Sequence, residues 1–247
     1  MKISNQEFKI FSKQIILKKI GLIGQKKIKK SKVLIIGMGG LGCPLLIYLA
    51  RLGVGTIGIV DDDKIEFSNL NRQIIYNQTD LNKSKVEVAK KNIKKISKQV
   101  KIKAYNIRVK EDNIQKIIKD FDIICDGTDN FETRLLINDN CLSQKKILVS
   151  AAVSGFTGHI FKFDFRKKTP CYRCFMPDVP DIDFNCETEG VTPTMTGVIG
   201  TLQANEVMNS ILNLKSDLDK KMLIFDSIKM NFRKVILSRD KECKNNC

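Results

Sequence analysis

The sequence lacks several features that would each point to a class of protein. It has no run of about 20 apolar residues, the length that crosses a bilayer, so it predicts no membrane span. It has no internal repeat and no low-complexity linker, which argues against a solenoid or a string of separate domains. It has one histidine, His159, in an alternating apolar segment without a cysteine or serine partner. We therefore interpret His159 as structural rather than catalytic.

Acidic residues are also few relative to basic ones. The 247 residues include 43 Lys and Arg against 27 Asp and Glu, a net charge of +16, which attracts acidic partners. Nucleic acid is one candidate partner and an acidic protein another. Alternatively, the positive charge reflects only lysine-rich helices that face solvent. Because no nucleic-acid-binding motif is present, we predict no nucleic-acid partner. Segment 1–19 carries charges throughout and does not resemble a secretory signal, so we expect a cytoplasmic protein.

Apolar strands alternate with helical segments over much of the chain. Segment 1–30 has apolar residues at helical spacing, and segment 31–153 alternates strand with helix, which is typical of a parallel sheet with helices on both faces. Segment 154–247 begins with an alternating strand, continues with a loop and a long helix over 197–214, and ends in two more strands. We therefore predict a single α/β domain: a Rossmann-like, doubly wound, mostly parallel sheet with N-terminal helices and a C-terminal antiparallel extension.

A glycine-rich turn follows the first predicted strand. Gly37, Gly39 and Gly42 in "KVLIIGMGGLG" form G-x-G-x-x-G between a strand and a helix, which is typical of a phosphate site at a helix N-terminus. The alternative is a tight strand–helix turn without a ligand. Asp61 ends the next strand, where an acid binds ribose hydroxyls in such folds. It begins the run Asp61–Asp63, which suggests either a bound cation or a solvated acidic loop. These features fit a dehydrogenase equally well.

Three further residues favour a triphosphate over a dinucleotide. Arg72 in "SNLNRQ" and Lys85 at the start of a predicted helix supply positive charge, and Asp129 in "CDGTDN" supplies a carboxylate for Mg²⁺. Each has an alternative role when taken alone. Arg72 could be a surface arginine, Lys85 a solvated lysine, and Asp129 the N-cap of the following helix. Their occurrence together indicates an ATP site.

The eight cysteines fall into three groups. Cys43, Cys125 and Cys141 lie in apolar segments and are expected in the core. Two close pairs, C-x-x-C and C-x-x-x-C, predict a structural four-thiolate zinc site, with a redox pair or unliganded thiols as alternatives: Cys171, Cys174, Cys243 and Cys247. Cys186 belongs to neither pair and lies in a polar loop, where it could act as a nucleophile.

Four stretches together resemble a known family. The segments "GMGGLGCPLLIYLARLGVGTIGIVDDD", "SNLNRQ", "TDNFETR" and "CYRC" are similar to the ThiF/MoeB/HesA family of ubiquitin-activating-enzyme-like adenylyltransferases, from about Phe8 to Cys247. The "DDD" run and the segment around Cys186 look closer to the thiamine branch (ThiF) than to the molybdopterin branch (MoeB).

The resemblance implies a reaction and a set of site residues. ATP is joined as AMP to the C-terminal glycine of a small ubiquitin-like sulfur-carrier protein ending in Gly-Gly, and pyrophosphate is released, for thiamine or molybdopterin synthesis. Asp129 holds Mg²⁺, with Asn130 beside it, and Asp61 contacts the ribose. The implied ATP contacts are Gly37, Gly39, Gly40, Gly42, Asp61, Asp63, Ser68, Asn69, Arg72, Gln73, Lys85, Asp129 and Asn130. The reaction needs no side-chain base, because a carboxylate is already nucleophilic at neutral pH.

The resemblance also implies partners. The family's N-terminal helix usually carries an arginine that reaches the ATP of a partner subunit, and here that position is Lys13, so we expect a homodimer with a trans phosphate contact. In similar proteins a cysteine at the position of Cys186 takes the activated acyl group or takes part in sulfur transfer, which implies a sulfurtransferase or cysteine desulfurase as a further partner. Two alternatives stay open: an NAD(P)-dependent oxidoreductase and a catalytically silent nucleotide-binding scaffold.

Overall fold

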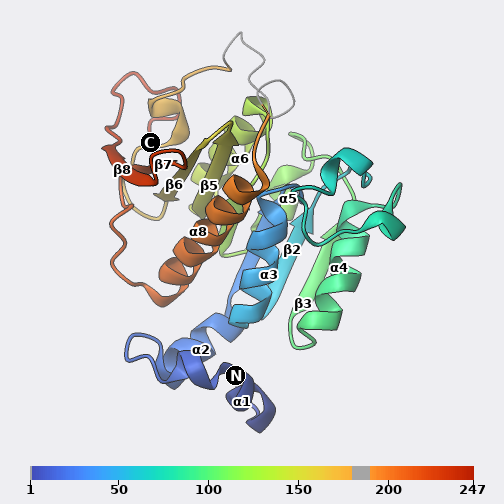
Figure 1. Ribbon diagram of the computed structural model, residues 1–247. Coiled ribbons are helices and arrows are strands. Elements are labelled where there is room, and N and C mark those ends of the chain that lie inside the picture. The colour runs from blue at the N-terminus through green and yellow to red at the C-terminus, as the bar shows by residue number, and fades with distance from the viewer. Residues whose placement is uncertain (1, 180–189) are drawn as a thin grey trace.

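The structure is a computed structural model that describes residues 2–179 and 190–247. Its centre is an eight-stranded sheet in the order β3-β2-β1-β4-β5-β6-β7-β8 (Figure 1). The first five strands are parallel, and the last three are antiparallel to their neighbours. The strands are β1 (Lys32–Ile36), β2 (Thr56–Val60), β3 (Lys101–Tyr105), β4 (Ile123–Asp126), β5 (Ile147–Ser154), β6 (Thr157–Asp164), β7 (Lys221–Asp226) and β8 (Asn231–Ile236). The predicted mixed sheet is confirmed.

Helices cover both faces of the sheet, and the side chains of β1 show why. Val33 and Ile35 point into one apolar cluster, whereas Leu34 and Ile36 point into the other. A strand buried on both faces has a continuous apolar sequence, as "VLII" does. The helices packed on the first face are α2 (Gly21–Lys30), α3 (Gly42–Leu52), α4 (Lys85–Ile96) and α8 (Pro193–Leu212). Those on the second face are α5 (Ile114–Lys119) and α6 (Phe131–Ser143).

The N-terminal helices α1 (Asn5–Ile15) and α2 extend beyond the sheet (Figure 1). Ser4 and Glu7 form a capping box at the start of α1. The Glu7 carboxylate also lies 2.6 Å from Lys29 Nζ and so ties α1 to α2. Large apolar side chains on and between these helices stay exposed, among them Ile16 at 73% and Ile23 at 74%. This pair of helices therefore offers an apolar surface to a partner.

The long helix begins earlier than predicted. The sequence indicated a helix over 197–214, but α8 starts at Pro193, because the Thr192 side chain caps the Met195 N–H and Pro193 occupies the first turn. It ends at Leu212, and Asn213 caps it in a left-handed conformation. Within residues 2–179 and 190–247, no helix combines the length and the apolar composition that crossing a membrane requires.

Candidate functional site

A cavity of about 830 Å³ opens at the carboxyl ends of the parallel strands. Its wall includes Ile36 at the end of β1, Val60 at the end of β2 and Gly127 after β4. The chain winds from β1 outward through β2 and β3, and then crosses back to β4 on the other side of β1. Open α/β sheets bind ligands at such a point of reversal. The fold therefore places the cavity where a ligand is expected.

The glycine loop forms the floor of this cavity, and at three of its glycines the protein leaves no room for a Cβ atom. Gly37 has φ +94°, and a Cβ there would lie 2.8 Å from the Gly127 carbonyl oxygen. A Cβ at Gly42 would lie 2.0 Å from the Gly37 carbonyl oxygen. A Cβ at Gly40 would lie 2.9 Å from the Thr196 methyl. Gly39 differs, because the nearest atom to its Cβ position is Gln73 Nε2 at 3.7 Å. The protein has room for a side chain at Gly39, so its absence keeps space for a ligand.

This difference between the glycines gives a test of the cavity as a nucleotide site. We expect Gly39→Ala to fold normally and to weaken ATP binding at least about tenfold, because the added methyl occupies ligand space rather than protein space. The matched control is Gly197→Ala in α8, where a Cβ meets nothing within 4 Å and the change adds helix propensity. Calorimetric titration with ATP measures both variants. Unchanged affinity in Gly39→Ala would rule out close approach of the ligand at Gly39.

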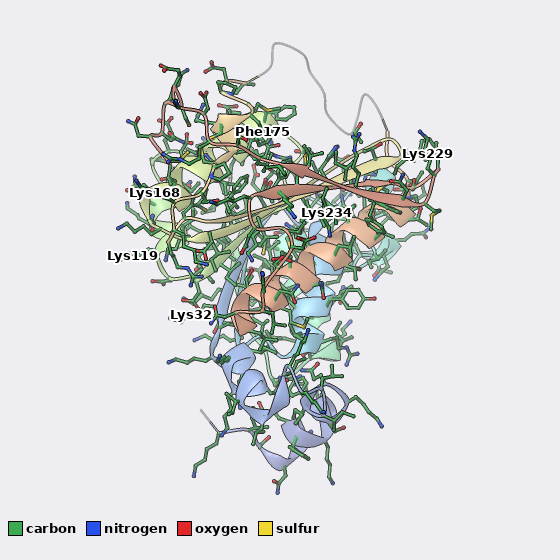
Figure 2. The ribbon with its side chains drawn as sticks, turned by 90° about the vertical axis from the view of Figure 1, so that its left-hand side faces the viewer. Lys32, Lys119, Lys168, Phe175, Lys229 and Lys234 are labelled. Atoms are coloured by element: carbon green, nitrogen blue, oxygen red, sulfur yellow. The ribbon has the colours of Figure 1, made fainter. Side chains whose placement is uncertain are left out.

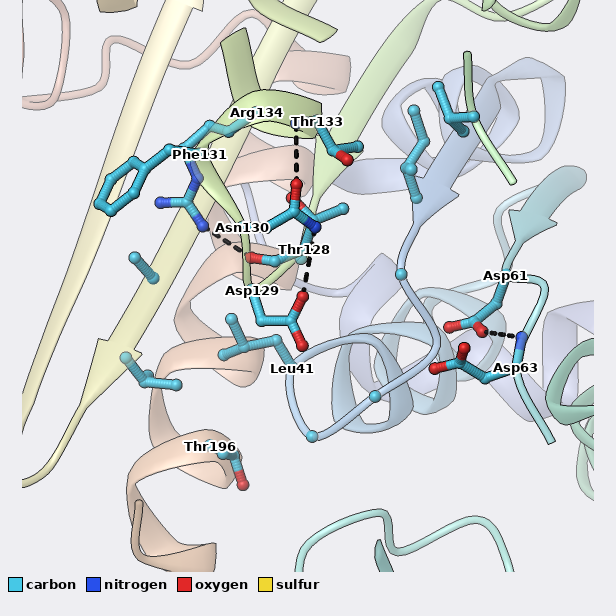
Figure 3. Close-up of a pocket in the computed structure, with 18 of the residues that line it drawn as sticks. Leu41, Asp61, Asp63, Thr128, Asp129, Asn130, Phe131, Thr133, Arg134 and Thr196 are labelled. Atoms are coloured by element: carbon cyan, nitrogen blue, oxygen red, sulfur yellow. Dashed lines mark hydrogen bonds between the residues drawn. The ribbon is translucent and has the colours of Figure 1, made fainter. Parts of the chain in front are cut away.

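Asp61 holds the glycine loop in place from the end of β2. One carboxylate oxygen accepts the Met38 N–H at 2.7 Å. The other accepts the Asp63 N–H at 2.9 Å, a hydrogen bond drawn in Figure 3. Burial raises the pKa of Asp61, and the nearby Lys85 ammonium opposes that rise. The carboxylates of Asp61–Asp63 offer oxygens within 4.8 Å of one another, so this run could also hold a cation. Asp61 is thus both a wall of the cavity and an anchor of its floor.

Lys85 is buried at the cavity wall rather than solvated. It starts α4, is 6% exposed, and its Nζ lies 2.7 Å from Asp63. Burial alone would lower the pKa of Lys85, but the carboxylates of Asp61 and Asp63 outweigh it and raise that pKa. The ammonium therefore stays charged and is held in position, and the alternative of a solvated lysine is wrong.

The segment "SNLNRQ" supplies a polar side of the cavity. Asn69 closes a short 3₁₀ turn by accepting the Glu66 N–H, and the Arg72 guanidinium donates to the Ser68 carbonyl oxygen. Asn69, Arg72 and Gln73 line the cavity, whereas Ser68 is not among the described residues that do so. Gln73 is 3% exposed, and its Oε1 finds no hydrogen-bond partner within the described chain. A buried acceptor left open in a cavity wall fits a ligand that donates a hydrogen bond.

The loop after β4 carries Asp129 into the cavity. Asn130, not Asp129, caps α6, because its side-chain oxygen accepts the Thr133 N–H at 2.9 Å. The alternative role of Asp129 as the helix cap is therefore wrong. The Asp129 carboxylate is exposed, and the Asn130 amide donates to it across a long 3.4 Å. Figure 3 shows it on the opposite side of the glycine loop from Asp61 and Asp63.

Arg134 and His159 line the cavity but were not predicted as site residues. Arg134 lies within the motif "TDNFETR", is 4% exposed, and pairs with the buried Asp126 at 3.4 Å. His159 reaches the cavity from β6. Burial lowers the pKa of His159, and the positive charge of Arg134 lowers it further, so the imidazole is neutral at pH 7. The motif could have signalled Arg134, but nothing in the sequence around His159 pointed to the cavity.

The four paired cysteines form one cluster. The sulfurs of Cys171, Cys174, Cys243 and Cys247 all lie within 4.8 Å of one another. Three pairs are 3.2, 3.7 and 4.0 Å apart. Four thiolates around a tetrahedral Zn²⁺ at about 2.3 Å would be about 3.8 Å apart. The cluster could therefore hold a metal ion with little movement.

The remaining cysteines among the described residues and Lys13 do not belong to the cysteine cluster or to the described wall of the cavity. Cys43, Cys125 and Cys141 are fully buried, as predicted. Cys186 lies outside the described residues. Lys13 is exposed on α1 and does not line the cavity of its own chain.

The strand order and the cavity at the ends of the parallel strands are those of a Rossmann-like α/β protein. A model of one protein family also matches most of the chain. The chain belongs to the ThiF family, whose model matches residues 11–245.

Two named relatives refine this assignment. The chain is 40% identical to "Adenylyltransferase and sulfurtransferase MOCS3" of Aedes aegypti over 96% of its own length and 54% of that protein. It is 41% identical to "Probable molybdopterin-synthase adenylyltransferase" of Porphyra purpurea over 94% of its own length and 61% of that protein. The chain thus spans little more than half the length of these relatives. The second name is that of a molybdopterin-synthase enzyme, so the similarity is to MoeB-like members, which corrects the expectation that the chain lies closer to the thiamine branch.

Solved structures share the fold. The crystal structure of PaaA superimposes with a TM-score of 0.81 at 20% identity, over 96% of this chain and 76% of that one. E. coli MccB superimposes with a TM-score of 0.77 at 24% identity, over 90% of this chain and 67% of that one. At these identities the likeness is one of fold.

Proposed function

We propose that this protein uses ATP to adenylylate the C-terminal glycine of a ubiquitin-like sulfur carrier, in the synthesis of molybdopterin. The observation that carries the proposal is the arrangement around one cavity: a glycine loop as its floor, a fixed lysine, a neighbouring arginine and an exposed carboxylate at its walls. The names of the relatives support the carrier and the pathway. A dinucleotide-dependent oxidoreductase would not explain why Lys85, Arg72 and Asp129 line the same cavity.

The residues divide the work of an in-line attack on the α-phosphorus. The N-terminus of α3 and the glycine loop bind phosphate through backbone N–H groups. Lys85 and Arg72 stabilise the negative charge that develops on the phosphoryl oxygens as the carrier carboxylate attacks. No side chain removes a proton, because the attacking carboxylate is ionised at neutral pH.

Metal ions complete the proposed site. Asp129 would hold Mg²⁺, whose charge shields the phosphate oxygens and pyrophosphate as it leaves. The exposed carboxylate of Asp129 fits this role, because its oxygens are accessible to a ligand in the cavity. The cysteine cluster would hold Zn²⁺ with four thiolates, and because all four positions are filled by protein the site is structural.

The cavity extends from the glycine loop to an apolar end. This end is lined by Phe161 of β6, by Met222 of β7, and by Phe175 from the loop after the first cysteine pair. We infer that the narrow, side-chain-free tail of the carrier lies there and delivers its carboxylate to the α-phosphorus. The 830 Å³ volume supports a site for a nucleotide and a short peptide together.

The neighbouring surface suits a carrier domain. Strand β8 pairs only with β7 within the described chain, so its outer edge has unpaired backbone groups. Met230, Phe232 and Ile236 are 74%, 54% and 72% exposed along it. Figure 2 shows the exposed Lys234 on β8 and the exposed Lys229 beside the start of β8, with the exposed Lys32, Lys119 and Lys168 at the left edge of the same view. We infer that an acidic carrier adds to the sheet at β8 and is drawn there by this charge.

The product of the reaction gives the direct test. After incubation with ATP, Mg²⁺ and a carrier ending in Gly-Gly, mass spectrometry should show one AMP on the carrier's C-terminal glycine. A carrier without its last glycine is the control and should stay unmodified. AMP on neither carrier, or on a side chain of this protein instead, would contradict the proposed function.

Lys13 is proposed to contact the phosphates of a partner subunit in a homodimer that uses the apolar surface of α1 and α2. We expect Lys13→Ala to slow adenylylation about tenfold, the effect of one charge-assisted hydrogen bond, without lowering the melting temperature. Lys9→Ala, on the same helix and also exposed, is the matched control. Equal rates for the two variants would show that Lys13 makes no such contact.

The remaining predictions extend the same proposal. Cys186 would receive the activated acyl group or sulfur, with a sulfurtransferase or cysteine desulfurase as the partner. A cytoplasmic location and ATP as the nucleotide belong to this proposal as well.

A further inference from the structure

The cysteine cluster is docked on the helix that begins at the nucleotide site. The backbone N–H of Tyr172, between two of the cysteines, donates to Asn138 Oδ1 of α6 at 2.9 Å. Arg173 makes a two-pronged ion pair with Asp139 of α6, at 2.8 and 2.9 Å. Asn245, between the other two cysteines, donates to the same carboxylate at 2.6 Å. Both cysteine segments thus meet at the middle of α6.

The side chain of Tyr172 continues from this docking point toward the nucleotide site. Its hydroxyl oxygen accepts from the Arg134 guanidinium at 3.3 Å, and the guanidinium lies 5.7 Å from the centre of the ring. The ring is fixed by Phe161 and Phe175, with centroids at 5.1 and 4.5 Å. Tyr172 is 2% exposed, so its position follows that of the cysteine segment.

Arg134 completes the connection to the loop that carries Asp129. Its guanidinium donates to the Thr128 carbonyl oxygen at 2.7 Å and to the Ala151 carbonyl oxygen at 3.2 Å, the first of which is drawn in Figure 3. Thr128 is bonded in turn to the buried Asp126 through its N–H at 2.9 Å and its hydroxyl at 2.6 Å. The carbonyl that Arg134 holds is that of the residue immediately before Asp129.

We propose that Tyr172 and Arg134 couple the cysteine cluster to the nucleotide site, so that a metal held by the four cysteines keeps the Asp129 loop in its Mg²⁺-binding position. Arg134 is a positioning residue in this account, because it fixes the backbone next to Asp129 and not the reacting atoms. The account rests on the proposed function for the role of Asp129. Loss of metal would release the two cysteine segments, move the Tyr172 ring, and leave the guanidinium held by Asp126 and the carbonyl groups alone.

Tyr172→Phe tests this connection, because it removes one hydroxyl and keeps the ring that packs on Phe161 and Phe175. We expect the metal-loaded variant to keep its metal content and its global stability, but to exchange the amide hydrogens of residues 127–130 about fivefold faster. The dissociation constant of Mg²⁺, measured in the presence of ATP, should rise by a similar factor, at the low end for coupled sites. Tyr48→Phe, in an exposed position on α3, is the matched control and should change neither quantity.

Removing the metal from the natural protein tests the same coupling from the other side. Chelation should speed exchange at residues 127–130 in the natural protein and have a smaller effect in Tyr172→Phe. Because coupling is reciprocal for binding free energies, ATP with Mg²⁺ should lower the dissociation constant of the metal in the cysteine cluster by the same factor by which that metal lowers the dissociation constant of Mg²⁺.

The outcomes separate this inference from the proposed function. Equal exchange at residues 127–130 in Tyr172→Phe and the natural protein would overturn the coupling, whether or not ATP binds. Faster exchange in a protein that adenylylates no carrier would support the coupling and contradict the function instead.

Discussion

Asp129→Asn is expected to slow adenylylation by about 10²–10³-fold, the usual effect of removing one group that stabilises transition-state charge. The substitution keeps the shape of the side chain and removes the charge that would hold Mg²⁺. Because Asp129 is exposed and Asn130 caps α6, the change should leave the melting temperature within about 2 °C of the natural protein. Single-turnover formation of the carrier–AMP product measures the rate.

A neighbouring carboxylate gives the matched control for this variant. Glu132 is exposed in the first turn of α6 and is not among the described residues that line the cavity. Glu132→Gln removes the same charge three residues away, so it should keep at least about half the natural rate. Similar losses in the two variants would mean that Asp129 acts only through the general electrostatic field of the helix N-terminus.

Cys243→Ser is expected to abolish metal binding and to lower the free energy of unfolding by about 4 kcal/mol. Cys171 and Cys243 are 72 residues apart in sequence, and their sulfurs lie 3.7 Å apart. A cross-link that closes a loop of this length restricts the unfolded chain by roughly that free energy in the chain-entropy account. Urea unfolding with and without a chelator, together with elemental analysis for one zinc per chain, measures the effect.

The chelator provides an internal control. It should destabilise the natural protein but leave the already metal-free Cys243→Ser unchanged. Cys141→Ser, in the core and outside the cluster, should keep its metal. A metal-free natural protein as stable as the metal-loaded one would show that the cluster does not stabilise this fold.

Local sequence patterns were sufficient to predict the sheet and the glycine loop. The run "VLII" predicts a strand buried on both faces, and both clusters of the core confirm it. A glycine after an apolar helical segment favours a helix end, and Gly53 follows α3 with φ +91°. These features depend on residues adjacent in the sequence.

Features that depend on distant residues were not predictable. Burial of Lys85 requires Asp63 from the end of another strand, and nothing near Lys85 in the sequence reveals that partner. The contact between Arg134 and Tyr172 joins residues 38 positions apart. Asn130 and Asp129 are equally good N-caps by type, and only the backbone geometry shows which of the two accepts the Thr133 N–H.

The sequence motifs also did not distinguish the molybdopterin branch of the family from the thiamine branch. In the proposed function, the glycine loop, Arg72, Lys85 and Asp129 serve ATP chemistry that is the same for the thiamine and molybdopterin branches. In the same proposal, discrimination between carriers depends on a docking surface along β8, where the exposed side chains include Phe232 and Ile236. Because such a surface is not encoded by a short sequence motif, the branch could not be predicted from the motifs alone.

Exchange of labelled pyrophosphate into ATP measures the reversal of the proposed adenylylation step itself and requires no later sulfur transfer. We expect exchange that requires Mg²⁺ and a carrier ending in Gly-Gly, and that is lost in Asp129→Asn. Absence of exchange with every Gly-Gly carrier, together with tight binding of NAD in the same cavity, would contradict it.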